Sequence, residues 1–502
     1  MSGSVWLPPG SRPDALPEIP RPHPPSWALP DPVDELADRL EDFVAAAVHP
    51  DEIAALLESD GLSDERIRER YGVKNSFALA ETLYERVERR YPEPDGPAGD
   101  PWRIGLLGCL LRGVVFALPG LAYVLGAPLF TGPGDLGLPA GTVPLLAGAL
   151  CGWSWNQGLA HRAYAWLGLG DRPAARRALL LGAPAGALLG SLVALLCAGG
   201  AGPAVVAFAA GQSCYLAAAT VLLVMGRERL LLAALGPMAL GAVLSLVDPL
   251  PEPAGAVLLL GSLAAVVVLA LREVAPTLRD EGGWIAGLAA LLPFGASGTA
   301  PARHRPAGRR LTGSLPYALF GLATGVLVLH AALGDVLAGG SATAVAAPAA
   351  VALTLSMGPA EWLLYRFRSD SLAGLRASGS ARDFRRVTVL TVVQCLAAYL
   401  AALLALSLAA SALWPHAPVP GGVRLAGLLL LGAVLWTGLL LQSFGAVTGA
   451  TAVCCAAALA QTLLLVTRTG DPHASGALVY GTAAAVQAAL VCTLLGRATA
   501  HR

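Results

Sequence analysis

The chain has 502 residues, of which 55% are hydrophobic and 14% charged, and its formal net charge is zero. Soluble domains carry about a quarter charged residues, so the composition excludes an ordinary soluble protein, and the neutral balance argues against a nucleic-acid partner. Apolar runs of about 20 residues recur from Arg103 onward, each long enough to cross about 30 Å of hydrocarbon. We therefore predict an all-α, polytopic membrane protein.

The part of the chain before the apolar runs divides in two. Residues 1–30 are rich in proline and lack a periodic apolar pattern, which predicts a disordered tail. Across residues 31–92 apolar residues recur at helical spacing, and Gly61 and Gly72 mark helix ends. This segment is therefore predicted to be a small, soluble helical bundle on the cytoplasmic side.

Within this bundle, Ser63 precedes two acidic residues, which is typical of a helix start. A helix-turn-helix DNA reader over residues 63–84 is an alternative, but acidic and basic residues are balanced there, which does not favour it. Residues 93–102 contain several Pro and Gly residues and are interpreted as a linker. The bundle is therefore expected to fold apart from the membrane domain.

Twelve apolar runs follow, six on each side of a long polar stretch. We predict two six-helix repeats, 103–272 and 313–502, joined by a cytoplasmic loop over residues 273–312. The weak apolar run 284–294 is too short to cross and is predicted to be an interfacial helix. The predicted crossings are 103–127, 141–163, 177–199, 203–225, 229–248, 253–271, 313–335, 343–365, 387–412, 423–441, 446–467 and 475–496.

Arginine is concentrated in the loops that follow even-numbered crossings. The loops of the opposite side hold only Arg424 and Arg468. The positive-inside rule therefore predicts a plasma-membrane protein with both termini in the cytoplasm. Each half then starts and ends on the same side, so the two halves are predicted to be parallel repeats.

The ends of the second and eighth crossings match each other. In each, an apolar helix becomes polar, passes through an arginine-rich loop and is followed by a new apolar run. The matching pairs, first half first, are Gln157 with Glu361, Arg162 with Arg366, Arg176 with Arg385 and Arg177 with Arg386. Such internal matches are typical of secondary transporters.

Glu361 is the main charged residue inside a predicted crossing. Because intramembrane carboxylates are costly, the functional hypothesis is substrate or ion coupling. The alternative is a structural pair with Arg366 or Arg162 near the cytoplasmic end. Its counterpart Gln157 cannot take up a proton, so coupling would lie in one half only. Asn156 and Gln157 either line a hydrated path between the halves or form hydrogen bonds between helices.

The loop arginines are candidates for binding a pyrophosphate or an acidic headgroup. The alternative is that they serve only to orient the protein in the membrane. The set comprises Arg162, Arg172, Arg176, Arg177, Arg366 and Arg368.

No motif for enzymatic chemistry is visible in the sequence. All eight cysteines lie in apolar runs without metal-ligand spacing, and His330, His416 and His473 are isolated. Neither a phosphate-binding loop nor a cluster of outward-facing acidic residues occurs. We therefore expect no enzyme activity, no metal, no cofactor and no nucleic-acid partner.

Two superfamilies resemble this pattern. The loop after the second crossing reads Gly170, Asp171, Ala175, Arg176 and Arg177, and is similar to the Gly-Asp and Ala-Arg-Arg loop of the MOP superfamily of polysaccharide and lipid-linked oligosaccharide flippases, including Pel-type exporters. The matching loop in the second half, 361–386, also resembles those exporters. The resemblance covers residues 103–497 by topology and only these loops by motif.

The major facilitator superfamily is the alternative. Asp171 and Arg172 fit its loop motif, but the expected glycine is absent and the arginine pair is displaced by one position.

The flippase resemblance implies a secondary transporter that moves a lipid-linked glycan or polysaccharide by alternating access. Glu361, Gln157 and Asn156 would then lie at its cytoplasmic mouth, and membrane lipid and a lipid-linked glycan would be its ligands. A proton-coupled small-molecule exporter is the first alternative. A membrane scaffold, with residues 31–92 docking a soluble synthase, is the second.

Overall fold

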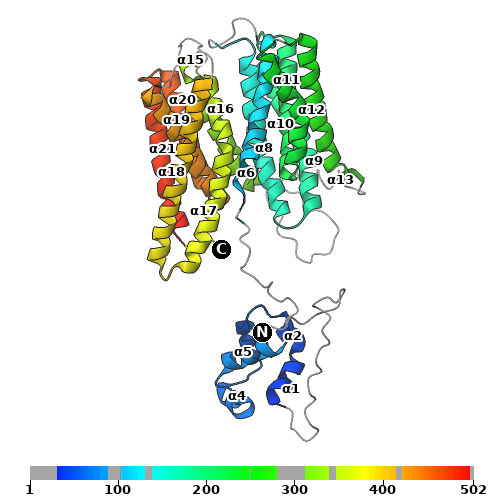
Figure 1. Cartoon of the computed structure of the whole chain (residues 1–502), viewed down its shortest axis with the longest axis vertical. Helices are drawn as coiled ribbons and strands as arrows, with labels where there is room; N and C mark the ends of the chain where they lie inside the picture. Colours follow the sequence, from blue (N-terminus) through cyan, green and yellow to red (C-terminus); the bar gives the residue numbers. More distant parts are fainter. Residues whose placement is uncertain are drawn as a thin grey trace, which may run out of the picture. The chain divides into compact units, whose positions relative to one another are not determined.

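The computed structural model describes residues 31–88, 102, 104–130, 138–248, 250–279, 311–337, 346–413 and 421–497. They belong to two compact units, one within Met1–Gly99 and one within Asp100–Arg502. Every regular element in these ranges is a helix (Figure 1), so the predicted all-α class is confirmed. The predicted tail, most of the predicted linker and the predicted interfacial helix lie outside the described residues.

The first unit contains five short helices around one hydrophobic core, in which Ile53, Leu57 and Leu83 have no exposed surface. The predicted helix ends are confirmed at Gly61 and Gly72, which adopt φ of +76° and +68°. The helices are α1 (Pro32–Arg39), α2 (Glu41–Ala46), α3 (Pro50–Ser59), α4 (Asp64–Tyr71) and α5 (Ser76–Arg86).

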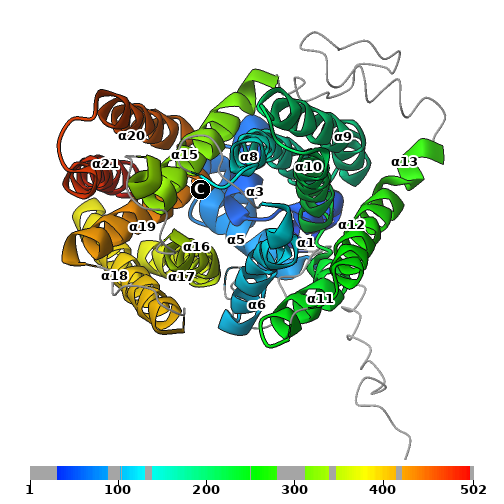
Figure 2. The same cartoon turned by 90° about the horizontal axis from the view of Figure 1, so that it is seen from above.

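The second unit contains two groups of helices, which lie side by side in Figure 2. Each group has its own hydrophobic core, around Leu179 and Leu222 in one and around Leu403 and Trp436 in the other. The first group comprises α6 (Leu106–Ala117), η2 (Leu118–Leu121), α7 (Ala122–Gly126), η3 (Ala127–Leu129), α8 (Thr142–Leu167), α9 (Arg172–Leu196), α10 (Pro203–Val224), α11 (Glu228–Ser245) and α12 (Glu252–Val274), after which comes the short α13 (Pro276–Arg279). The second comprises η5 (Leu311–Gly313), α15 (Leu315–Leu337), α16 (Ala346–Leu355), α17 (Met357–Ala377), α18 (Ala381–Leu413), α19 (Gly422–Ser443), α20 (Val447–Thr467) and α21 (Pro472–Leu495).

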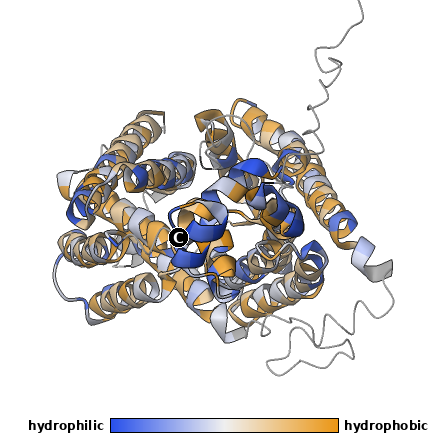
Figure 3. Ribbon diagram, turned by 90° about the horizontal axis from the view of Figure 1, so that it is seen from below, coloured by the Kyte–Doolittle hydropathy of each residue, from blue (hydrophilic) through white to orange (hydrophobic). Residues whose placement is uncertain are grey.

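The outer surfaces of these helices are apolar. Leu188 and Leu196 on α9, and Leu459 and Val466 on α20, are 72–75% exposed, which is unfavourable in water and favourable against lipid. Figure 3 shows hydrophobic residues along the long helices. Ten helical segments in the described residues are long and apolar enough to cross a membrane. The chain is therefore an integral, multi-pass membrane protein.

Two of the twelve predicted crossings are not among these ten segments. One is α8, which carries several polar residues in its second half. The other corresponds to α16 and α17, which are interrupted at Ser356, and α17 carries Glu361 and three arginines. Both segments are helical where crossings were predicted, but their polar residues lower the hydropathy that identifies a span.

Both α6 and α17 adjoin an interruption in the helical backbone. Pro119 ends α6, because proline cannot donate to the helical ladder, and the chain continues as the 3₁₀ helix η2. At the other break, Ser356 is buried and its Oγ lies 3.1 Å from the hydroxyl of Tyr399 on α18. Tyr399 in turn stacks on Trp436 of α19. The break in the second group is therefore held by side chains of two neighbouring helices.

The two groups meet along two seams. In seam one, α6 of the first group packs against α16 and α17 of the second. In seam two, α8 of the first group packs against α15 of the second. The first helix of each group therefore contacts the second helical segment of the other.

Candidate functional site

Seam one contains a backbone-to-backbone contact between two glycines. A Cβ atom on Gly113 of α6 would lie 2.9 Å from the backbone nitrogen of Gly358 on α17. A Cβ atom on Gly358 would lie 2.8 Å from the backbone oxygen of Cys109. Only glycine fits at either position without moving the helices apart, as in small-residue contacts between other membrane helices.

An ion-pair cluster lies beside this glycine contact. Arg112 follows Cys109 by one turn of α6, and its guanidinium contacts the carboxylate of Glu361 on α17. The same guanidinium lies 3.1 Å from the carboxylate of Glu228, the first residue of α11. The hydroxyl of Tyr365, one turn after Glu361, is a hydrogen-bonding neighbour of both Arg112 and Glu361. Seam one therefore joins three helices through one arginine.

This cluster carries two carboxylates for one guanidinium. The side chains of Arg112, Glu228 and Glu361 are 35%, 29% and 23% exposed, so all three are partly removed from solvent. Charges in such surroundings interact more strongly than in water. With both carboxylates ionised the cluster has one excess negative charge, which a proton or a bound cation can neutralise.

The structure corrects the predicted partners of Glu361. Arg366 instead pairs with Asp370 of its own helix, at 3.5 Å, and its guanidinium lies over the ring of Trp362. Arg162 is buried in α8 of seam two. The prediction considered only arginines close in sequence or matched by the repeat, whereas the partner comes from α6. Arg112 and Glu228 were missed, although an arginine inside an apolar run is itself a signal of function.

Arg368 has a structural environment rather than a free headgroup position. Its guanidinium lies 4.4 Å from the ring centre of Trp102 and 5.0 Å from that of Phe444, as in cation–π pairs. It also donates a hydrogen bond to the backbone carbonyl of Ser443, the last residue of α19. Trp102 stacks on Tyr365 with ring centres 6.3 Å apart. These contacts fix α17 beside seam one.

Seam two places Gln157 where seam one places Glu361. A Cβ atom on Gly321 of α15 would lie 2.7 Å from Cγ of Gln157, so the amide side chain packs directly on α15. Ser154 donates a hydrogen bond of 2.8 Å to the carbonyl of Ala318. His161 stacks on Tyr317, with ring centres 3.6 Å apart. The two matched residues Gln157 and Glu361 thus both lie on contacts between the groups.

Asn156, next to Gln157, is buried, and its Oδ1 has no hydrogen-bond partner among the described residues. A buried amide oxygen without a partner costs free energy, so such an atom in a membrane protein indicates a polar ligand or water. Asn156 therefore stays a candidate for contact with a polar substrate.

Glu273 near the end of α12 pairs with three arginines of the first group. Its carboxylate lies 2.8 Å from Arg176, 2.9 Å from Arg227 and 3.8 Å from Arg172. Its own side chain is only 9% exposed. Arg177 is half-buried, and its Nε has no hydrogen-bond partner in the described residues. Arg172 and Arg176 were predicted to attract an external anion, but the protein itself supplies their anion.

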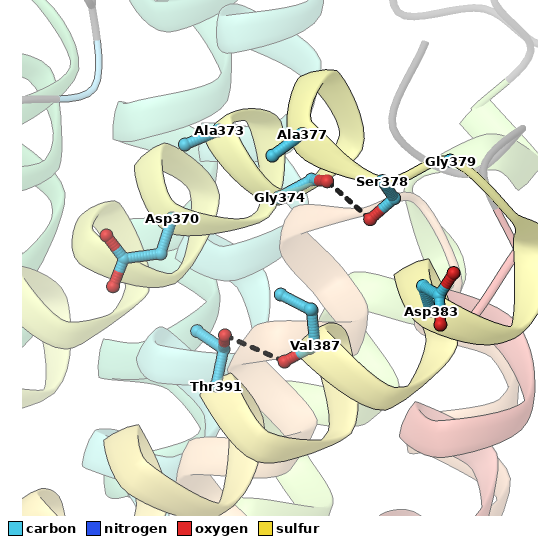
Figure 4. Close-up of a pocket in the computed structure, with 9 residues that line it drawn as sticks. All are labelled: Asp370, Ala373, Gly374, Ala377, Ser378, Gly379, Asp383, Val387 and Thr391. Atoms are coloured by element: carbon cyan, nitrogen blue, oxygen red, sulfur yellow. Dashed lines mark hydrogen bonds between the residues drawn. The ribbon is translucent and has the colours of Figure 1, made fainter.

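A groove of about 520 Å³ lies between α17 and α18 beside the turn that joins them (Figure 4). Its hydroxyl groups are bonded within their own helices, Ser378 to the carbonyl of Gly374 and Thr391 to that of Val387. Asp370 at its edge pairs with Arg366. The groove therefore offers few free polar groups. Across the described ranges, no cluster of His, Cys, Asp or Glu has the geometry of a metal site.

No protein-family model matches this chain, and no curated protein sequence is similar to it.

Proposed function

We propose that the chain is a secondary transporter that moves a lipid-linked or polymeric glycan across the membrane by alternating access between two parallel six-helix halves. The twelve crossings of this proposal include α8 and the interrupted pair α16–α17. Both termini are placed in the cytoplasm, according to the arginine distribution.

The packing order within the groups supports two related halves. In each group the second segment packs on the third, the third on the fourth, the fourth and the fifth on the sixth, and the first on the fifth. The two seams are also reciprocal, because each group contributes its first and second segments to them. Two parallel repeats related by an axis along the membrane normal are expected to pack in this way.

The position of the contacts between the halves supports alternating access. In seam two they run from the C-terminal end of α8 and the N-terminal end of α15, where His161 meets Ser314 and Gly158 meets Ala318, to the middle of α15, where Gly325 meets Leu150. In seam one the contacting helix of the first group is α6, whereas α7 packs on α11 and α12 of its own group. In the proposed orientation these ends face the cytoplasm, so the halves are closed there. The reciprocal seams, with the Arg112–Glu361 pair in one of them, are the observation that carries the proposal.

Disulfide cross-linking tests this mechanism. A Cβ atom on Gly158 would lie 3.3 Å from Cβ of Ala318, close to the spacing of about 3.5–4.5 Å in disulfides. Gly158→Cys with Ala318→Cys, in a chain whose native cysteines are replaced by alanine, should lock the halves together. The matched control is Gly148→Cys with Ala194→Cys, a pair 3.2 Å apart within the first group.

The assay follows a fluorescent, polyprenyl diphosphate-linked oligosaccharide in proteoliposomes, with quenching by an impermeant reductant. We expect the wild-type protein to flip the probe. Oxidation should stop transport by the seam-two cysteine variant but not by the control variant. Reduction of the disulfide by a thiol reagent should restore transport. Equal arrest of both pairs, or none, contradicts movement at seam two.

A proton-coupled small-molecule exporter is the second candidate, and the excess carboxylate beside Arg112 favours it. A proteoliposome that ignores the glycan probe but accumulates a cationic dye along a pH gradient would assign this function instead. If the protein is inactive in both assays, the remaining hypothesis is a membrane scaffold.

A further inference from the structure

The two groups differ in how they neutralise the arginines at the start of their third helical segment. In the first group, Arg172 and Arg176 begin α9, and Glu273 at the end of α12 is their anion. Arginines in the first turns of a helix face the positive end of its dipole, so an adjacent negative charge is needed to stabilise them. The first group contains that charge in its own sequence.

In the described part of the second group, which ends at Arg497, no carboxylate lies at the end of α21, and Asp383 in the first turn of α18 accepts a hydrogen bond from Ser380. Arg385, the match of Arg176, also contacts the end of the last helix of its group. There, however, its Cγ lies 3.1 Å from the position of a Cβ atom on Gly496, which follows α21. Arg382, Arg385 and Arg386 are exposed, and none forms an ion pair with any described residue. Among the described residues, the contact equivalent to Arg176–Glu273 therefore has the cation without the anion.

These three arginines lie where lipid headgroups are expected. Helix α18 has 33 residues, about 50 Å, which exceeds the roughly 30 Å of hydrocarbon. Figure 1 shows the α17–α18 hairpin extending beyond the ends of its neighbours. Leu390 and Val393, one and two turns after Arg386, are 52% and 56% exposed and form a lipid-facing surface. Arg382, Arg386, Leu390 and Val393 share one face of the helix, so the cations adjoin the hydrocarbon-facing residues.

We propose that Arg382, Arg385 and Arg386 bind a phosphate-bearing anion, supplied by an anionic lipid headgroup, in the place where the first group uses the Glu273 carboxylate. Arginine presents a planar fork of donors that matches phosphate oxygens, and three such side chains within two turns can surround one headgroup. The second half of the protein would then depend on the lipid composition of its membrane, while the first half would not.

Titration of the purified full-length protein with phosphatidylglycerol, followed by native mass spectrometry, tests this site. The variant is Arg382→Gln/Arg385→Gln/Arg386→Gln. Each arginine near an anionic surface contributes roughly five-fold in affinity, so we expect about a hundred-fold weaker lipid binding. Arg385→Gln alone should weaken binding about five-fold, which keeps the test valid if the triple variant does not fold.

The matched control removes the same charge elsewhere. Arg66, Arg68 and Arg70 on α4 are also exposed, so Arg66→Gln/Arg68→Gln/Arg70→Gln should bind the lipid like the wild type. An equal loss in both variants, or no loss in either, would overturn the proposed site. Competition by inorganic pyrophosphate, measured on protein in neutral phosphatidylcholine, distinguishes the two sources of the phosphate group, a lipid headgroup and a soluble anion. Weak competition supports a lipid headgroup, whereas tighter binding of free pyrophosphate overturns the lipid assignment in favour of a soluble anion.

Discussion

Arg112 of α6 and Glu361 of α17 form an ion pair that joins the first group of helices to the second. Glu228, which shares the guanidinium at 3.1 Å, belongs to the same group as Arg112. If the groups separate at seam one, Arg112 loses Glu361 but keeps Glu228. The arginine is thus never left without an anion, which lowers the cost of opening relative to a simple buried pair.

Replacement of Glu361 should impair transport without unfolding the protein. Glu361→Gln removes the charge across seam one, and a hydrogen bond to a charged group is worth roughly 1–3 kcal/mol. We expect at least about a ten-fold loss of probe transport, normalised to membrane-inserted protein. Asp370→Asn is the control, because it breaks an exposed pair within one helix. Wild-type transport by the Glu361 variant would sink the coupling role and leave a structural pair.

The glycine contact of seam one should not accept a side chain. Gly113→Ala places a methyl group 2.9 Å from the backbone of α17, which we expect to lower stability by about 1–3 kcal/mol. Gly108→Ala on the same helix meets nothing within 4 Å and should be neutral or slightly stabilising. Thermal unfolding in detergent compares the two. Equal melting temperatures would show that the helices separate at this contact without cost.

Loss of Glu273 should make the first group dependent on lipid as well. Glu273→Gln leaves Arg172, Arg176 and Arg227 without their shared carboxylate. We expect a lower melting temperature in phosphatidylcholine nanodiscs and recovery when phosphatidylglycerol is included, because the headgroup phosphate replaces the carboxylate. A deficit that is the same in both lipids would indicate that geometry, not charge, makes Glu273 necessary.

Residues 31–92 should be helical when expressed alone, and their stability should fall in acid. The backbone N–H of Val33 and then the Arg86 guanidinium lower the pKa of Asp31 from its usual value. A lowered pKa in the folded state stabilises the fold above the unfolded value of about 3.9, and this contribution disappears as the pH falls through the folded value. Asp31→Asn should therefore reduce stability at neutral pH and weaken the acid transition, measured by circular dichroism. A random-coil spectrum of the parent fragment would exclude an independent bundle.

The orientation of the chain is open to a direct test. A reporter enzyme fused after Arg502 should be active in the cytoplasm, and one inserted at Asp335 should be active outside, because arginine-rich loops stay in the cytoplasm. An external reading after Arg502 would remove the argument for parallel halves.

The positions of the membrane helices follow from the sequence, because apolar runs and arginine-rich loops report directly on the bilayer. Hydropathy alone does not identify α8 and α16–α17 as crossings. These helices carry polar residues, Gln157 and Glu361 among them, that contact other helices. Glu361 was predicted as a candidate because a carboxylate in an apolar run is conspicuous. Its partner was predicted wrongly, because Arg112 lies in a different helix and no local pattern connects the two.

The loop arginines show the same limit. Their number and spacing were visible in the sequence, but their partner was not, since Glu273, which pairs with Arg172 and Arg176, lies at the end of a distant helix. Likewise, the glycine at position 496 has meaning only because folding brings it against Arg385.

The contact of Gly113 with Gly358 also affects how the halves can move. Where side chains of two helices interdigitate, the helices must separate before they can slide or roll past each other. Gly113 and Gly358 have no side chains to interdigitate, so α6 and α17 can roll over each other at a constant distance. The glycine contact then permits rotation of α6 against α17, and the adjacent Arg112–Glu361 ion pair must break before that rotation can occur.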